Sequence, residues 1–209
     1  MVEKEILKAV WRLQFLKGSA RLEDLRKEVA APGLDEALAA LIARGSLERA
    51  GEGYMLTVGG RGAIKVVVCT GVFDLLHPGH VFILLRAREY GDILAVVVAR
   101  DATVRRRKRV PIVPEEQRVE MVGHLRPVDL AVLGKEWDHL SIIEELRPDV
   151  IVLGPDQAHD PDAIRRDLRE RGLEVEVVRI GEARGCSLCS TRSIIRRVRE
   201  MDKGGLDYL

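Results

Sequence analysis

Short apolar runs alternate with amphipathic stretches from residue 65 onward. Five runs are rich in Val, Ile and Leu and short enough to be buried strands of a parallel sheet; they cover residues 65–70, 93–99, 130–133, 150–153 and 175–180. Apolar residues at helical spacing predict the following helices: residues 78–90, 115–125, 140–146, 163–171 and 191–201. This alternation predicts an α/β fold, with helices covering both faces of a parallel sheet.

Residues 1–60 follow a different pattern and predict a separate small domain, ahead of a larger one over residues 64–202. Apolar positions at helical spacing predict three helices, and two short runs around the glycines at 51–53 predict a hairpin. Three helices followed by a hairpin resemble a winged helix. The Gly-Gly-Arg-Gly sequence at 59–62 is typical of a flexible linker between the two domains.

Charge and helix composition argue against DNA binding by this small domain. Its nine basic and nine acidic residues cancel. A helix that reads bases normally presents Arg, Lys, Asn or Gln. The solvent face of the third predicted helix instead carries Asp35, Glu36, Ala39, Ala40 and Ala43. We therefore favour a structural or dimerising role, which would make the protein a homodimer, and rank DNA binding below it.

The composition is that of a globular protein. The 209 residues are 46% hydrophobic with a net charge of +1, which allows a sizeable core and gives no bulk attraction to nucleic acid or membranes. The sequence has neither a run of eighteen apolar residues nor a signal-peptide pattern. We therefore expect a cytoplasmic protein with no membrane partner.

The segment 71–80 joins the first predicted strand to its helix and contains His77 and His80. Pro78 suits the first position of a helix, so the two histidines flank the first helical turn. Free backbone N–H groups and the helix dipole favour an anion there, and two imidazoles add hydrogen-bond donors. One capping and one surface histidine would be the structural alternative. The pair after a buried strand favours phosphate binding.

Other strand ends carry polar residues that should gather at the same edge of the sheet. Gly154 and Asp156 follow the fourth strand, where they suit either nucleotide binding or a plain β-turn. Five basic residues at 105–109 suggest a loop that closes over a triphosphate, or a solvated face. Ser190 and Thr191 open the last helix, as caps or as phosphate ligands.

The sequence His77-Pro78-Gly79-His80, after Thr-Gly-Val-Phe-Asp at 70–74, resembles the HxGH signature of nucleotidyltransferases. With the blocks Ala-Arg-Asp at 99–101 and Leu-Gly-Pro-Asp-Gln at 153–157, the chain most resembles archaeal-type FAD synthetases, which are FMN adenylyltransferases with a Rossmann-like sheet. The resemblance implies that the catalytic residues are His77, His80, Arg109, Ser190 and Thr191. It implies that the substrate-binding residues are Thr70, Val72, Phe73, Asp74, Gly79, Arg100, Asp101, Gly154, Asp156, Gln157 and Arg179.

By this resemblance the substrates are ATP and FMN, with a divalent cation, Mg²⁺, bridging phosphates and no residue of the chain assigned as a metal ligand. Arg118 matches an arginine of the family and equally suits a surface ion pair. Phe73, Leu75 and Leu76 are either an apolar slot for the flavin or part of the core. Two other functions stay open. One is a CTP-dependent cytidylyltransferase acting on a polyol phosphate, and the other is a non-enzymatic winged-helix regulator that senses a nucleotide.

Three cysteines do not make a disulfide framework in a cytoplasmic protein. Cys69 lies in the first predicted strand of the sheet and is expected in the core. Cys186 and Cys189 cannot fill a zinc site by themselves. Inert thiols are the favoured interpretation of this pair, ahead of a redox-sensitive pair and of zinc shared with other ligands.

Overall fold

The computed structural model describes residues 2–106 and 110–203. The chain divides into two compact units. One contains the residues up to Val66 together with Gly91–Ile93, and the other contains Val67–Tyr90 and the residues from Leu94 onward. Each unit is described by itself below. Among the helices of the described residues, none combines the length and apolarity that crossing a membrane requires.

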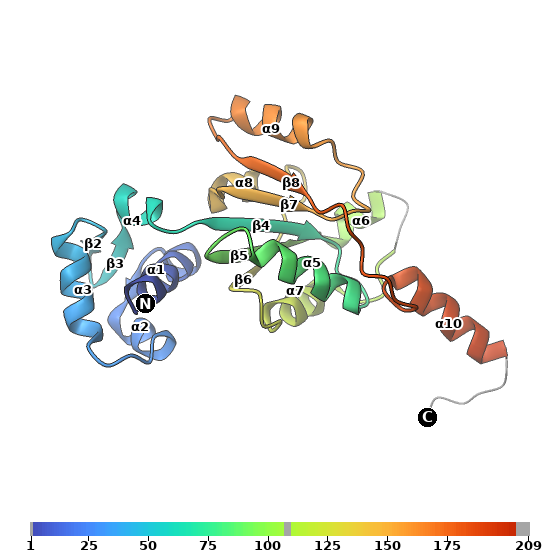
Figure 1. Cartoon of the computed structure of the whole chain (residues 1–209), viewed down its shortest axis with the longest axis horizontal. Coiled ribbons are helices and arrows are strands. Elements are labelled where there is room, and N and C mark those ends of the chain that lie inside the picture. The colour runs from blue at the N-terminus through green and yellow to red at the C-terminus, as the bar shows by residue number, and fades with distance from the viewer. Residues whose placement is uncertain (1, 107–109, 204–209) are drawn as a thin grey trace. The chain divides into compact units, whose positions relative to one another are not determined.

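The N-terminal unit packs helices against a small antiparallel sheet of order β1-β3-β2. Its elements are α1 (Val2–Lys17), β1 (Ala20–Arg21), α2 (Leu22–Glu28), α3 (Leu34–Ala43), β2 (Leu47–Ala50), β3 (Gly53–Leu56) and α4 (Val58–Gly62). The three predicted helices and the hairpin are confirmed (Figure 1). Strand β1, whose two residues pair with Tyr54 and Gly53, is too short to be predicted from the apolar pattern. That the unit acts as a winged helix stays a prediction.

The predicted solvent face of α3 is confirmed. Its buried residues are Leu34, Leu38 and Leu41, and its exposed positions are Asp35, Glu36, Ala39, Ala40 and Ala43. The helix therefore presents small and acidic side chains to solvent, with none of the donors that read bases.

The predicted linker at 59–62 is wrong, because these residues form most of helix α4. The Thr57 side chain caps the helix by accepting from the Gly60 N–H at 3.1 Å, and its hydroxyl donates to the Gly45 carbonyl at 2.6 Å. Gly60 is buried, and a Cβ there would overlap the carbonyl of Ser46. The glycine run permits close packing, which sequence composition alone does not distinguish from a linker.

The second unit is built on a parallel sheet of order β6-β5-β4-β7-β8. Its strands are β4 (Val66–Gly71), β5 (Ile93–Val98), β6 (Leu130–Leu133), β7 (Val150–Leu153) and β8 (Glu176–Arg179). All five match the predicted strands to within one residue. Every residue of β5 and β7 is buried, as expected for strands covered on both faces. The predicted α/β fold is confirmed.

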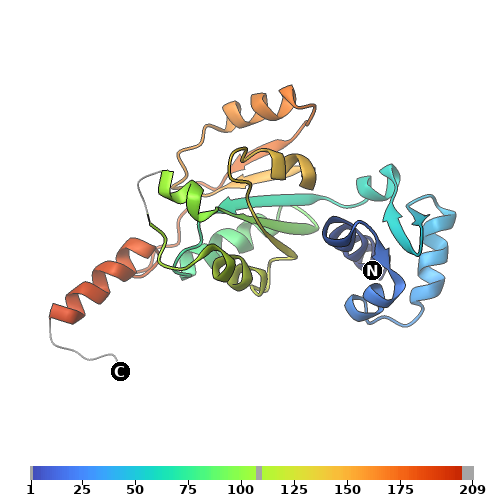
Figure 2. The same cartoon turned by 180° about the vertical axis from the view of Figure 1, so that it is seen from behind.

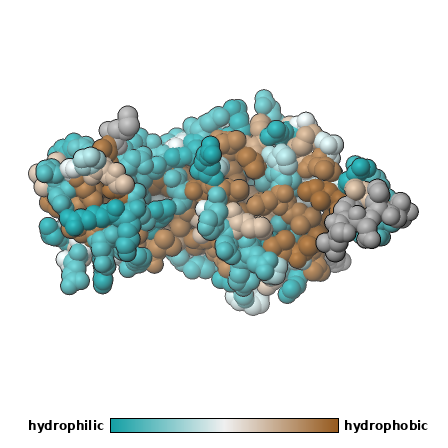
Figure 3. All heavy atoms as spheres, turned by 90° about the horizontal axis from the view of Figure 1, so that it is seen from below, coloured by the Kyte–Doolittle hydropathy of each residue, from teal (hydrophilic) through white to brown (hydrophobic). Residues whose placement is uncertain are grey.

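Helices cover both faces of this sheet. The helices of this unit are α5 (Pro78–Arg88), α6 (Asp101–Arg106), α7 (Glu115–Gly123), α8 (Ser141–Leu146), α9 (Pro161–Glu170) and α10 (Thr191–Lys203), of which α10 extends away from the sheet (Figure 1). Helices α5 and α7 lie on one face and α8 and α9 on the other (Figures 1 and 2). Apolar atoms gather on the lower surface where α5 and α7 lie (Figure 3), and Leu85 and Met121 on these helices are exposed.

The core includes Cys69, as predicted. Its side chain is buried among Val67, Val96 and Val152 of the central strands, and this burial raises the pKa of the thiol to about 12. A thiol with that pKa stays protonated at neutral pH and is a poor nucleophile. Cys69 therefore contributes packing and no chemistry.

Gly60→Ala tests the packing role of the glycine run. The added methyl must displace the β2–α3 connection, so the N-terminal unit should lose about 1–3 kcal/mol of unfolding free energy. Gly62→Ala is the matched control, because nothing lies within 4 Å of a Cβ there. Urea unfolding followed by Trp11 fluorescence, in a Trp137→Phe background, measures both. Equal stability of the two variants would contradict the packing role.

Candidate nucleotide-binding site

The amino end of helix α5 is organised by its own two histidines. His77 is the N-cap residue, with extended backbone, and its ring Nδ1 accepts a hydrogen bond from the His80 N–H at 3.4 Å. Pro78 occupies the start of the helix, as the sequence predicts. The two imidazole rings stack, with centroids 3.8 Å apart. The cap bond holds one ring and stacking aligns the other, so the pair forms one preorganised unit.

The cap bond also determines where His77 carries its proton. Because Nδ1 accepts a hydrogen bond, the neutral ring carries its hydrogen on Nε2 and can donate it to a ligand. Burial lowers the pKa of His77 below the ordinary 6.5, and the nearby charge of Asp156 acts in the opposite direction. His77 is therefore a neutral donor at neutral pH, with an exposed carboxylate in its vicinity.

A second helix terminus approaches the first through Gly79. A Cβ at Gly79 would lie 2.6 Å from the Cys189 carbonyl oxygen, so only glycine permits this approach. The next residue, Ser190, caps α10: its Oγ accepts from the Ser193 N–H at 3.0 Å. Thr191 is 9% exposed. Gly79 thus lets the amino ends of α5 and α10 share one site, which favours an anion with several charged groups.

Arg118 lies fully buried beneath this site. Its guanidinium donates to the Val113 carbonyl at 2.9 Å, to Asp101 at 2.6 Å and to the Val72 carbonyl. The surface ion pair considered for Arg118 is therefore wrong, because the side chain has no exposed area. It joins the β4–α5 loop, the start of α6 and the segment before α7.

Asp74 and Glu115 complete the same network. The Asp74 carboxylate accepts from the Ile112 and Val113 N–H groups, both at 2.9 Å, and is 3% exposed. Glu115 accepts from Arg100 at 2.7 Å and from the Asp101 N–H. Three residues predicted to bind substrate, Asp74, Arg100 and Asp101, thus hold the protein's own loops.

Two more predicted residues hold the loop after β7. The Gln157 side chain donates to the Thr70 carbonyl at 2.6 Å and so links this loop to β4. Arg179 donates to the carbonyls of Gly154 at 3.0 Å and Gln157 at 2.6 Å, and also to the His159 carbonyl. Asp156, between these anchored residues, is exposed. The anchors leave Asp156 as the side chain of this turn that can meet a ligand.

Phe73 belongs to the core and does not form an exposed slot. It is 4% exposed, packs among the core side chains and lies 5.1 Å from the His80 ring, centroid to centroid. Its φ of 51° is unusual for a residue with a side chain, and a Cβ at Gly71 would lie 2.7 Å from the Phe73 ring. Leu76 also packs on the core. Phe73 therefore supports the histidine pair from below.

The predicted loop of basic residues is only partly correct. Arg105 and Arg106 lie in the last turn of α6, a helix that the apolar pattern does not predict. The predicted catalytic residue Arg109 lies outside the described residues. The structural importance of Glu115 and Arg118 is not apparent from the sequence, because an Arg and a Glu in an amphipathic helix usually face solvent.

Cys186 and Cys189 form a disulfide, so the favoured interpretation of inert thiols is wrong. Only two residues lie between them in sequence, and the pair lies directly before the cap of α10. Among the described residues, no group of three His, Cys, Asp or Glu side chains is arranged to hold a metal ion. Shared zinc at the CxxC pair therefore has no further ligands in the described part of the chain.

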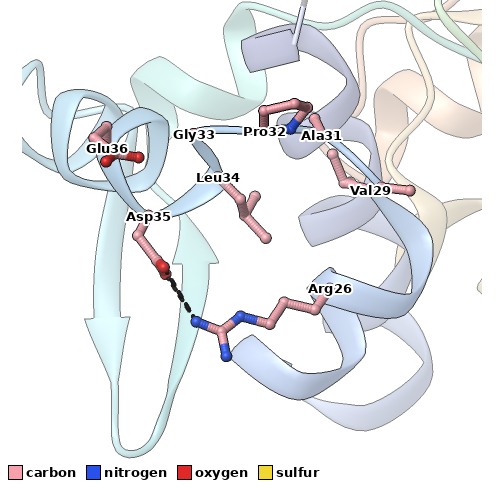
Figure 4. Close-up of a pocket in the computed structure, with 9 residues that line it drawn as sticks. Arg26, Val29, Ala31, Pro32, Gly33, Leu34, Asp35 and Glu36 are labelled. Atoms are coloured by element: carbon pink, nitrogen blue, oxygen red, sulfur yellow. Dashed lines mark hydrogen bonds and ion pairs between the residues drawn. The ribbon is translucent and has the colours of Figure 1, made fainter.

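A hollow of about 510 Å³ lies in the N-terminal unit, between the end of α2 and the start of α3. Arg26 and residues 29–36 line it, and Arg26 is held by Asp35 at 3.1 Å (Figure 4). Arg26 and Asp35, both in the lining, pair with each other. We assign it no ligand.

Comparison with known proteins agrees with this geometry. Residues 68–197 match the model of the cytidylyltransferase-like family, a span that contains both histidines, the Arg118 network and the start of α10. The match covers more than half of the 209 residues. The chain therefore belongs to the cytidylyltransferase-like family and carries a nucleotidyltransferase fold.

Within that family the chain is similar to curated proteins named FAD synthase. It is 51% identical over 145 residues to the FAD synthase of Methanothermobacter marburgensis, a match that covers 68% of this chain and 90% of that protein. It is 49% identical over 138 residues to the FAD synthase of Methanothrix thermoacetophila, covering 66% and 96%.

A solved structure with a related fold is entitled a lipopolysaccharide core biosynthesis protein from Thermoplasma volcanium. It shares 39% identity with this chain, at a TM-score of 0.57, over 58% of this chain and 99% of that one. Nearly the whole of that protein corresponds to part of this chain.

Arg118→Met should unfold the second unit at lower denaturant concentrations. The substitution removes the fully buried charge that pairs with half-buried Asp101 and leaves two carbonyls unsatisfied, at a cost of about 3–5 kcal/mol. Arg86→Met is the control, because Arg86 pairs with Glu89 at the surface and such pairs contribute about 1 kcal/mol or less. Urea unfolding monitored by circular dichroism measures both. Equal losses in the two variants would show that the buried network does not stabilise the unit.

Proposed function

We propose that this chain is an FMN adenylyltransferase, which transfers AMP from ATP to FMN and yields FAD and pyrophosphate. The observation that carries the proposal is the 51% identity over 145 residues to a protein named FAD synthase, 90% of which is covered. The geometry supports the same reaction class, because two helix amino ends and two imidazoles converge where a triphosphate would need donors.

The reaction needs little acid–base chemistry from the protein. An oxygen of the FMN phosphate bonds to the α-phosphorus of ATP. The bond from that phosphorus to the oxygen bridging to the β-phosphate breaks, and its electron pair leaves with pyrophosphate. The attacking phosphate is already an anion, so catalysis depends on alignment and on stabilising the charge that develops.

The described residues divide into ligand contacts and supports. In our proposal His77 and His80 donate to the α- and β-phosphates, and the amino end of α10 with Ser190 and Thr191 receives the β- and γ-phosphates. Asp156 accepts hydrogen bonds from the adenosine moiety. Gln157, Arg179, Asp74 and Asp101 position the loops through their internal hydrogen bonds. Arg109 stays a sequence prediction for the leaving group.

Phosphoryl transfer of this kind generally uses a divalent metal ion, and we propose Mg²⁺. The described part of the chain offers no group of three metal-ligating side chains. Mg²⁺ commonly retains water and binds through substrate phosphates with one or two carboxylates, so the ion would enter with ATP as part of the substrate. The protein's donors then bind the phosphate oxygens.

The N-terminal unit contributes no residue to this proposed chemistry. Its solvent-facing α3 lacks base-reading side chains, and residues 1–67 lie outside the family match. We therefore retain a structural or dimerising role for residues 1–60 and a catalytic domain over residues 64–202 as proposals.

A pyrophosphate-release assay tests the substrates. The full chain with Mg²⁺ is given ATP or CTP together with FMN, glycerol 3-phosphate or inositol phosphate, and FAD is identified by chromatography. We expect turnover with ATP and FMN. Turnover with CTP and a polyol phosphate, without FAD formation, would overturn the proposed substrates and leave the nucleotidyltransferase class standing.

His77→Ala and His80→Ala should each lose at least about two orders of magnitude in turnover, as for removal of one preorganised donor.

The protonation state of His77 gives a separate prediction. Burial lowers its pKa below 6.5, so between the folded and unfolded values the unfolded state binds the additional proton. Unfolding free energy should therefore rise with pH through this interval and decline in acid. The C2 proton of His77, assigned by its loss in His77→Gln, should titrate by NMR with a midpoint below 6.5. A midpoint above 6.5 would show that Asp156 dominates over burial.

A further inference from the structure

Trp137 is the most unusual surface residue of the second unit. It follows β6 in the 134–140 loop and is 85% exposed. Tryptophan is normally buried over much of its surface, because its ring contributes a large hydrophobic area. The ring therefore lacks the packing that would explain its presence within the described fold.

Arg106 holds this ring from the end of α6. Its guanidinium carbon lies 5.0 Å from the Trp137 ring centroid, and the same guanidinium donates to the Glu136 carbonyl. An arginine in this position interacts favourably with the ring face. The contact fixes the orientation of a ring that remains accessible to solvent.

The loop around Trp137 is anchored on both sides. Arg100 donates to the Gly134 carbonyl at 2.9 Å. Asp138 accepts from Arg171 at 2.6 Å and from the Leu140 N–H at 3.0 Å. These contacts hold both ends of a short loop, so Trp137 lies on a backbone segment that hydrogen bonds fix in place.

The position of the loop points to the acceptor side of the site. In the sheet order β6-β5-β4-β7-β8, the histidine loop follows the central strand β4. Asp156 follows β7 on one side, whereas Arg106 and Trp137 follow β5 and β6 on the other. Arg100 bonds to Glu115, which also accepts from Asp101, and Asp101 bonds to Arg118. Through this chain the Trp137 loop is connected to the loop that carries the histidines.

The segment before α7, on the same side of the site as Trp137, adds exposed apolar residues. Ile112 is 57% exposed, and its backbone N–H is held by Asp74 of the histidine loop. Val110, in the same segment, is also exposed. A ligand that extends from the histidines toward β5 and β6 would therefore meet an apolar surface before it meets the aromatic ring.

We propose that Trp137, oriented by Arg106, is the stacking platform for the planar ring system of the acceptor. The inference rests on the proposed function, since it takes the flavin ring of FMN as the planar group. Aromatic stacking contributes affinity with little dependence on hydrogen bonding. Trp137 would thus favour FMN over acceptor phosphates without a flat ring, such as glycerol 3-phosphate.

Tryptophan fluorescence tests binding without turnover. The chain has two tryptophans, and Trp11 is buried in the N-terminal unit. FMN is titrated in the presence of Mg²⁺ and α,β-methylene ATP, in which the bond to be broken is replaced by a stable one. After correction for light absorbed by FMN, the fluorescence of Trp11→Phe, which retains Trp137, should be quenched strongly. The fluorescence of Trp137→Phe, which retains Trp11, should be quenched weakly. Equal quenching of both variants would overturn the platform.

Steady-state kinetics separates the platform from a general structural role. Trp137→Ala should raise KM for FMN about tenfold, equivalent to about 1.4 kcal/mol, with KM for ATP unchanged. Trp137→Tyr should restore most of the affinity. Leu85→Ala is the matched control, because Leu85 is an exposed apolar residue on α5, and it should change neither constant.

The outcomes distinguish the two proposals. An unchanged KM for FMN in Trp137→Ala, in a wild type that makes FAD, would overturn the platform and leave the adenylyltransferase proposal intact. A wild type that makes no FAD, yet whose Trp137 is quenched by FMN, would overturn the adenylyltransferase proposal and support a flavin-stacking role for the ring.

Discussion

One buried cation constrains the edge of the sheet where the candidate site lies. Arg118 satisfies two backbone carbonyls and the Asp101 carboxylate from a position without solvent exposure. A charge in such a place is tolerated only when its partners are fixed around it, so the loops that supply them can adopt few other conformations. Asp74 and Glu115 extend the same requirement to neighbouring backbone N–H groups. The buried hydrogen bonds therefore restrict the loop that presents His77 and His80 to few conformations.

This constraint separates residues that hold the site from residues that face it. Asp74, Asp101, Gln157 and Arg179 resemble ligand-binding positions in sequence, yet their hydrogen bonds go to the protein's own backbone or to Arg118. Several polar residues in one block of sequence can thus hold a loop in place, while one exposed neighbour is left to contact a ligand. In the turn after β7 that neighbour is Asp156.

The sequence predicted the sheet and the histidine-capped helix well, because both arise from local patterns. Strands buried on both faces give continuous apolar runs, and Pro78 marks a helix start irrespective of its surroundings. Other features depend on contacts between distant segments. Nothing local distinguishes Gly60, packed on Ser46, from a linker glycine, or Arg118 from a surface arginine. Helix α6 is short and highly charged, so periodicity could not reveal it, and the pairing of Cys186 with Cys189 depends on redox conditions that composition does not specify.

The contact between Gly79 and Cys189 joins two parts of the chain that are made at very different times. Gly79 belongs to the first helix after β4, and Cys189 lies two positions before the start of the last described helix. A nascent chain that has emerged only as far as β8 already contains the histidine pair, but it lacks the second helix terminus. In the proposed function, nucleotide affinity would therefore develop only once α10 has been made. ATP would then act as a late folding ligand, binding and stabilising only the completed domain.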